Sequence, residues 1–87
     1  MFYVYVLLCK YEQINNEFYI GSCKDLKNRY KEHLNKEVKT TKKFSEINLV
    51  YYEACLNKTD ALIREKQLKT GFGRGYLKRR LVNSLRD

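Results

Sequence analysis

The chain has 87 residues, and its 18 Lys and Arg against 10 Asp and Glu give a formal net charge of +8. A chain of this length supports one domain with a modest core, which we take to span residues 1–87. No apolar run is long enough to span a bilayer and the first residues lack a signal-peptide pattern, so we expect a cytoplasmic protein without a membrane partner. The positive charge attracts polyanions, which makes nucleic acid the expected partner; a solvated surface that only aids solubility is the alternative.

Two apolar runs near the start predict an antiparallel hairpin. The first extends from Phe2 to Cys9 and the second from Glu17 to Ser22, with a polar loop over residues 10–16 between them. Because side chains alternate along a strand, Tyr5 and Tyr19 converge if the pairing places both on one side of the sheet. Gly21 lies where any side chain would crowd that spot.

A helix is predicted next. Asp25 is placed to begin it, as a cap or as a favourable charge in its first turn, and the helix should run to about Asn35. Arg29 and His33 are four residues apart, so we expect them beside the buried stripe, at the margin between core and water. The buried stripe itself is expected to consist of Leu26, Tyr30 and Leu34.

The middle of the chain predicts a loop, a third strand and a second helix. The basic stretch Lys36–Lys43 suits contacts to phosphate, although a solvated connector fits it equally well. Asn48–Ala54 is predicted as a strand, and residues 58 to about 70 as a helix capped by Asn57 with Asp60 as the acidic partner. One face of the strand is expected to carry Leu49, Tyr51 and Glu53.

Glu65 is out of place on the predicted inner face of this second helix. It lies four residues after Ala61 and three before Leu68, both apolar. Burial of a carboxylate is costly unless the group is paired or bound to a metal. We therefore expect either a divalent cation or a salt bridge to a nearby Lys or Arg at this position.

The glycine-rich residues 71–75 follow a helix rather than a strand, which disfavours a phosphate-binding glycine loop. We expect Gly71 to end the second helix in a left-handed conformation, and Gly73 and Gly75 to turn the chain. A final amphipathic helix is predicted from the apolar positions Tyr76, Leu77, Leu81 and Leu85. The fold class is therefore expected to be α+β, with a small three-stranded antiparallel-type sheet flanked by about three helices.

The three cysteines, Cys9, Cys23 and Cys55, are odd in number and widely separated. This spacing indicates reduced, small apolar side chains rather than a disulfide framework. A zinc site made from the three cysteines and His33 is the alternative.

The candidate functional residues are two tyrosines, an arginine, a histidine and a partly buried glutamate. Arginine binds phosphate oxygens in pairs, glutamate holds a hard divalent cation, and a phenol or an imidazole moves a proton. This set suits phosphoryl chemistry if the fold brings its members together.

These residues also carry a family resemblance. Tyr3-Val4-Tyr5 resembles the first half of the GIY-YIG nuclease signature, with tyrosine replacing the initial glycine, and Tyr19-Ile20-Gly21 matches the second half. The segment from Gly21 to Arg29 resembles the family's strand-to-helix passage. The resemblance runs over nearly the whole chain and is closest to the small stand-alone bacterial members.

The resemblance implies a metal-dependent endonuclease with a single Mg²⁺ or Mn²⁺ on Glu65. By this resemblance Tyr5 activates water, directly or through His33, Tyr19 positions the water or the phosphate, and Arg29 stabilises the transition state. A free phenol has a pKa near about 10, so Tyr5 is expected to depend on nearby cations and to give an alkaline optimum.

DNA is the implied substrate, in branched, flapped or damaged form, with DNA repair as the implied process and RNA left open. Contacts to nucleic acid are assigned to Lys24, Lys42, Lys43, Arg74, Lys78 and Arg79. A second hypothesis is a non-catalytic nucleic-acid-binding module. A third is a nuclease subunit that needs a protein partner or a homodimer, because so small a domain has little surface for selecting a substrate.

Overall fold

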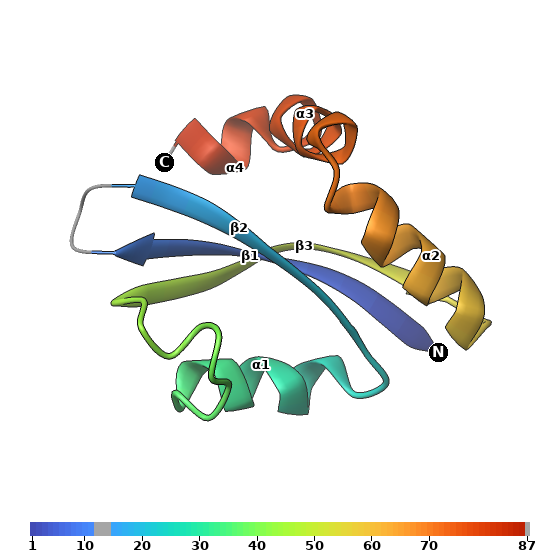
Figure 1. Ribbon diagram of the computed structural model, residues 1–87, viewed down its shortest axis with the longest axis horizontal. Helices are drawn as coiled ribbons and strands as arrows, with labels where there is room; N and C mark the ends of the chain where they lie inside the picture. The colour runs from blue at the N-terminus through green and yellow to red at the C-terminus, as the bar shows by residue number, and fades with distance from the viewer. Residues whose placement is uncertain (12–14, 87) are drawn as a thin grey trace.

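The structure, a computed structural model, describes residues 1–11 and 15–86, so the middle of the loop expected over residues 10–16 lies outside it. Three antiparallel strands, β1 (Phe2–Tyr11), β2 (Asn15–Cys23) and β3 (Glu46–Cys55), form a sheet in the order β2-β1-β3 (Figure 1). β1 is central and covered on both faces, so every residue from Val4 to Cys9 is buried. This explains why its sequence is an unbroken apolar run rather than an alternating one.

Helices cover both faces of the sheet. α1 (Leu26–Leu34) lies on one face, and α2 (Lys58–Leu68), α3 (Gly71–Arg80) and α4 (Val82–Arg86) lie on the other (Figure 1). The expected α+β class is confirmed, although the described residues form four helices because the last predicted helix is divided at Leu81. None of the helices in this described part is long and apolar enough to cross a membrane.

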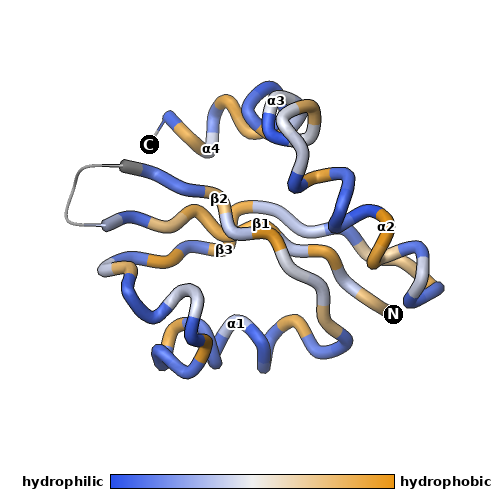
Figure 2. Tube along the Cα trace, in the orientation of Figure 1, coloured by the Kyte–Doolittle hydropathy of each residue, from blue (hydrophilic) through white to orange (hydrophobic). Residues whose placement is uncertain are grey.

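The alternation of β1 side chains builds a core on each side of the sheet. Val4 and Val6 pack with the α2–α4 layer, whereas Tyr5 and Leu7 pack on the α1 side. Figure 2 shows the hydrophobic residues concentrated along the strands, with hydrophilic residues prevailing on α1 and α2. The α1-side core is the one that contains the tyrosine singled out from the sequence.

A bulge changes which β3 side chains share a face. The register with β1 shifts between Val6 and Leu7, which face Tyr51 and Leu49 and leave Val50 unmatched. Leu49 then packs on the α1 side and Tyr51 on the opposite side. The expectation that Leu49, Tyr51 and Glu53 share one face is wrong, because an extra residue in one strand breaks the period of two.

The cap of α1 is confirmed and its buried stripe is not. Asp25 accepts a hydrogen bond at 3.0 Å from the backbone N of Asn28, and Asn35 ends the helix. Leu34, however, is 47% exposed, and His33 is completely buried. The expected margin position of His33 is therefore wrong, because the chain that follows α1 folds back and covers the imidazole.

The passage from α2 to α3 also differs from the expectation. α2 ends at Leu68, and Thr70 caps α3 by accepting a hydrogen bond from the backbone N of Gly73 at 3.1 Å. Gly71 thus begins a helix instead of ending one, and no described glycine has a positive φ. Gly73 serves close packing, because a Cβ there would lie 2.4 Å from the carbonyl oxygen of Gln67.

Candidate active site

The hydroxyl of Tyr5 is the centre of a hydrogen-bonded cluster between β1 and α1. Its oxygen lies 2.8 Å from Nε2 of His33 and 3.3 Å from Nε of Arg29. Arg29 and His33 occupy successive turns of α1, so their four-residue spacing directs both toward the sheet. Tyr5 itself is only 1% exposed.

A buried threonine contacts the other nitrogen of the His33 ring. Nδ1 lies 2.7 Å from Oγ1 of Thr41, which in turn lies 3.5 Å from the carbonyl oxygen of Val38. These contacts define a direction. Because the Thr41 hydroxyl donates to the carbonyl of Val38, its oxygen accepts from Nδ1–H of His33, which leaves Nε2 to accept the proton of the Tyr5 hydroxyl. Every buried side-chain polar atom in the described residues has a partner, so this buried chain is fully satisfied.

Burial sets the protonation of the pair. It raises the pKa of Tyr5 to about 12, and the hydrogen bond from Arg29 only partly opposes the shift. Burial and the positive charge of Arg29 lower the pKa of His33 below its ordinary 6.5. At neutral pH the phenol therefore keeps its proton and the imidazole can accept one. Arg29 lowers the pKa of Tyr5, as expected of a nearby cation, but desolvation outweighs this effect and the net shift is upward.

Glu32 orients the guanidinium of Arg29. Its Oε1 accepts from Nη1 of Arg29 at 3.0 Å, and both side chains are about one-third exposed. No side chain in the described part of the molecule bonds to Nη2 of Arg29. That nitrogen keeps both of its N–H donors for an oxygen of a bound anion.

Tyr19 and Gly21 reach the cluster from the edge strand β2. The ring centroid of Tyr19 lies 6.3 Å from that of Tyr5 and 5.1 Å from that of His33, so the predicted convergence of the two tyrosines is confirmed. Gly21 pairs with Tyr5 across the sheet, and a Cβ at this position would lie 2.6 Å from the Tyr5 hydroxyl oxygen. The missing side chain makes room for that hydroxyl.

Glu65 lies on α2, across the sheet from α1. Its carboxylate forms a salt bridge with Lys69 at 2.7 Å, and its side chain is 17% exposed. Burial alone would raise the pKa of Glu65, but hydrogen bonds with Lys69 and Ser22 outweigh it and keep the carboxyl ionised. Ser22 follows Gly21 on β2, so the carboxylate meets the edge strand at the level of the Tyr5 cluster.

The structure thus gathers four of the five predicted catalytic residues and places the fifth beside them. Tyr5 contacts Tyr19, Arg29 and His33, and the rings of Tyr19 and His33 also lie against each other. Within the described residues, no hydrogen bond or salt bridge joins Glu65 to any of the four. Glu65 is connected to the cluster through β2, because its partner Ser22 follows Gly21, which pairs with Tyr5.

The donor chemistry at Glu65 fits a hard divalent cation. Mg²⁺ is commonly held by one or two carboxylates, with water and substrate phosphate completing the shell. Glu65 offers one ionised carboxylate beside the hydroxyl of Ser22. Among residues 1–11 and 15–86, no three His, Cys, Asp or Glu side chains could hold a metal together, so the cysteine–histidine zinc alternative is wrong. The cysteines are free thiols.

Sequence reasoning missed three residues of this site: Ser22, Glu32 and Thr41. The only signal for Thr41 was its place in a short loop after His33. The basic composition of Lys36–Lys43 indicated an exposed loop and gave no sign that Thr41 is buried. Glu32 lay at the helical i+3 spacing from Arg29, which favours an ion pair and could have been noticed.

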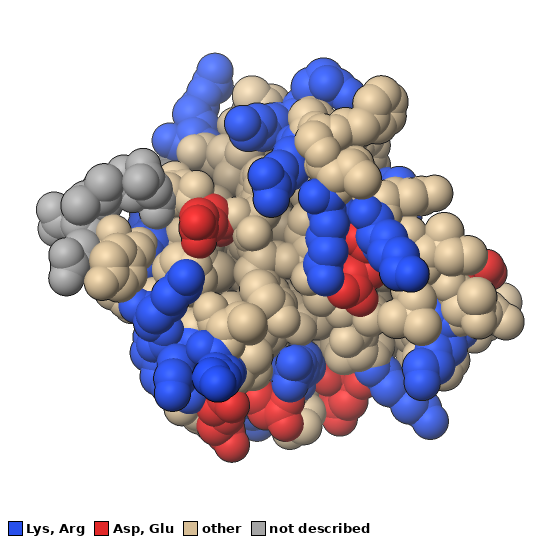
Figure 3. Space-filling model, in the orientation of Figure 1, with Lys and Arg blue, Asp and Glu red and all other residues tan. Residues whose placement is uncertain are grey.

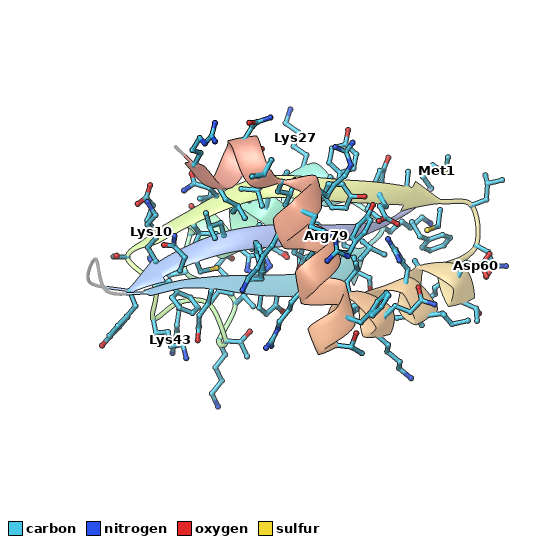
Figure 4. The ribbon with its side chains drawn as sticks, turned by 90° about the horizontal axis from the view of Figure 1, so that it is seen from above. Met1, Lys10, Lys27, Lys43, Asp60 and Arg79 are labelled. Atoms are coloured by element: carbon cyan, nitrogen blue, oxygen red, sulfur yellow. The ribbon has the colours of Figure 1, made fainter. Side chains whose placement is uncertain are left out.

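The residues assigned to nucleic acid are all exposed and come from both layers. In Figure 3 the basic side chains gather over α3 and α4 and, separately, over the connection between α1 and β3. Figure 4 places Arg79 above the sheet and Lys43 beyond its β2 edge. The edge that carries the site is thus flanked by cations from two directions. The α1 layer carries Lys24, Lys42 and Lys43, and α3 carries Arg74, Lys78 and Arg79.

These features define an α+β protein whose tyrosine, histidine and arginine cluster is equipped for phosphoryl chemistry. A family model of the GIY-YIG catalytic domain matches residues 1–79. The chain is also 36% identical over 69 residues to the UPF0213 protein SSP2268 of Staphylococcus saprophyticus subsp. saprophyticus, a match that covers 78% of this chain and 79% of the relative. No solved structure matches it significantly.

The chain therefore belongs to the GIY-YIG family, a nuclease superfamily. Membership implies a nucleic acid substrate, and members of the family generally use a divalent metal.

Proposed function

We propose that the protein is a metal-dependent endonuclease that hydrolyses phosphodiester bonds in DNA, with Mg²⁺ or Mn²⁺ as its metal. The observation that carries this proposal is the buried chain from Tyr5 through His33 to Thr41, with Arg29 bonded to the phenol. A core that served packing alone would need none of these polar groups. Buried polar networks are costly when incomplete. In this network the free donors are those on Nη2 of Arg29, where a phosphate can approach.

In this proposal His33 is the final proton acceptor and Tyr5 the relay. A water that attacks phosphorus gives a proton to the Tyr5 oxygen while Tyr5 passes its own proton to Nε2 of His33. Thr41 holds Nδ1–H throughout, which leaves Nε2 as the accepting nitrogen. No free phenolate is required, which suits a phenol with a pKa of about 12.

Arg29 and Tyr19 face the substrate. The free Nη2 of Arg29 binds a phosphate oxygen and stabilises the charge that develops on phosphorus. Tyr19, which is partly exposed, positions the attacking water or the phosphate.

Glu65 would hold the divalent cation, whose Lewis acidity stabilises charge on the scissile phosphate and the leaving 3′ oxygen. The side chain of Lys69 is 53% exposed, so it can turn into solvent at little cost when a cation takes its place on the carboxylate. The β2 edge lies between two groups of basic side chains, which favours a nucleic acid substrate such as DNA (Figure 3).

A cleavage panel tests the proposal. Single-stranded, duplex, flapped and branched DNA and RNA are incubated with the protein in Mg²⁺, Mn²⁺ or EDTA. We expect cleavage of at least one DNA substrate with metal, none in EDTA, and loss of cleavage in Glu65→Gln with folding and binding retained. Glu37→Gln, at an exposed position, is the matched control and should cut like the parent.

Cleavage in EDTA, or by Glu65→Gln at the parent rate, would refute the metal assignment. A parent that binds DNA but cuts no member of the panel would favour the non-catalytic binding module instead.

A further inference from the structure

A second concave surface lies on the opposite side of α1 from the edge strand β2, which carries Tyr19. It is an open groove of about 840 Å³ between α1 and the strands β1 and β3. Three tyrosines, Tyr3, Tyr30 and Tyr52, line it, with Leu49 between them and Lys24 and Lys27 at the rim. Asp25 also lines it, but its carboxylate is occupied as the cap of α1.

The aromatic wall of this groove is held in place and partly open. Tyr30 is fixed by bonds of its hydroxyl to the carbonyl oxygen of Ile47 and the backbone N of Leu49, both at 3.3 Å. Tyr3 packs edge-on against Tyr52, with ring centroids 6.0 Å apart. Tyr52 nevertheless remains 54% exposed. Tyr52 therefore offers a planar ligand an accessible ring that Tyr3 supports from one side.

The groove connects with the proposed catalytic edge through Lys24. This residue lines both the groove and a smaller cavity of about 260 Å³ that contains Ser22 and Cys23. Ser22 is the residue that contacts Glu65. Tyr52 is also the β3 partner of Tyr5 across the sheet. A strand whose phosphate lies at the catalytic edge can thus continue past Lys24 into the groove.

We propose that the groove binds unpaired nucleotides adjoining the scissile bond, with a base stacked on Tyr52. The inference rests on the proposed nuclease function and names its substrate class: nucleic acid with a single-stranded segment beside the cleaved bond. The rim lysines supply the charge that a phosphate backbone requires, and Figure 4 shows Lys27 projecting past the β3 edge, on the opposite side from Lys43. Aromatic rings with adjacent cations are the common means of holding single strands without reading their sequence.

The proposed ligand differs from duplex DNA in that its bases are unpaired. In a duplex both faces of every internal base are already stacked, so none can lie on Tyr52 without being unpaired first. A single strand or a flap carries no such cost. The groove therefore selects by strandedness rather than by sequence.

The chain contains no tryptophan, so Tyr52→Trp places a sole tryptophan, which can be excited selectively, inside the groove. Tyr11→Trp, at a 49% exposed tyrosine near the far end of β1, is the matched control. In EDTA, a ten-nucleotide oligothymidylate should quench Tyr52→Trp and leave Tyr11→Trp nearly unchanged. A blunt duplex of equal length should quench neither, and oligouridylate separates DNA from RNA.

Affinity provides the second readout. Tyr52→Ala should weaken oligothymidylate binding by about tenfold or more, while Tyr52→Phe, which keeps the ring, should stay within about twofold of the parent. Equal quenching of both reporters, quenching by the duplex, or unchanged affinity in Tyr52→Ala would overturn the groove assignment. Because binding is read without metal, a parent that cuts nothing refutes the nuclease proposal and leaves these outcomes interpretable.

Discussion

Nε2 of His33 lies 2.8 Å from the hydroxyl oxygen of Tyr5, although the two residues are 28 positions apart in the chain. This contact joins the central strand to α1 and determines what each group can do. The phenol donates, the imidazole accepts, and the free nitrogen edge of Arg29 lies beside them. Thr41 completes the arrangement by accepting from the other ring nitrogen.

Thr41→Val should destabilise the protein by about 1–3 kcal/mol, because it leaves the Nδ1–H of His33 buried without an acceptor at nearly constant volume. Thr40→Val, one residue earlier and exposed, is the control and should change stability by less than about 0.5 kcal/mol. Urea denaturation of both variants measures the difference. If Thr41→Val unfolds at the same urea concentration as Thr40→Val, Thr41 does not hold the imidazole.

The free energy of unfolding should fall as the pH drops below about 6.5. In the unfolded chain His33 titrates near its ordinary pKa, whereas burial lowers it in the fold, so the unfolded chain binds the proton first and is favoured on acidification. The contribution is complete above pH 6.5 and is lost as the pH falls through the folded pKa. Denaturation curves from pH 7.5 to 5 should show this slope in the parent and lack it in His33→Gln.

Because His33 is the sole histidine, its NMR titration reads the folded pKa directly. A midpoint above 6.5 would contradict the buried neutral imidazole. The same protonation should set the rate profile, since cleavage needs neutral His33 and a protonated Tyr5. We expect a plateau at neutral pH, in place of the alkaline optimum that Tyr5 alone suggests.

Gly21→Ala should impair both folding and cleavage. Its Cβ would approach the Tyr5 hydroxyl to 2.6 Å and displace the ring from His33, at a cost of about 1–3 kcal/mol. Gly71→Ala is the matched control, because a Cβ there meets nothing within 4 Å. Thermal unfolding and cleavage assays on both should separate them clearly. Parent-like behaviour of Gly21→Ala would show that the hydroxyl does not require this space.

Binding to duplex DNA should depend steeply on salt. If the five basic side chains of the α1–β3 connection and α3 each neutralise one phosphate, the logarithm of the affinity should fall against that of the salt concentration with a slope of about −4 to −5. The slope is obtained from fluorescence anisotropy measured at salt concentrations from about 50 to about 200 mM. A value near zero would exclude a mainly electrostatic interface. The five residues are Lys42, Lys43, Arg74, Lys78 and Arg79.

The sequence predicted the strands, the first two helices and the meeting of Tyr5 with Tyr19, because each follows from a local period or cap. It could not place His33 in the core. Helical spacing ranked Leu34 as the buried residue, and the ranking is reversed because Thr41 and its loop cover the imidazole. That covering is a tertiary contact over eight residues and leaves no periodic signal.

The bulge at Val50 and the start of α3 at Gly71 escaped prediction for related reasons. A bulge has no fixed composition, so alternation alone predicts the wrong face for Tyr51. At Gly71 the glycines suggested a turn, but Thr70 supplies a cap and Gly73 is needed for close packing. The salt bridge of Glu65 with Lys69 was expected as one of two alternatives, and its position next to Ser22 depends on the sheet register.

The single-turnover cleavage rate of Arg29→Lys, measured beside the parent on the best substrate of the panel, tests the central claim most directly. Lysine keeps the charge but cannot bond Tyr5, Glu32 and a phosphate together from one planar group. We predict a rate on the order of a hundredfold lower or more, equivalent to about 3–4 kcal/mol, with DNA affinity within about threefold of the parent. A variant that cuts as fast as the parent would contradict the account.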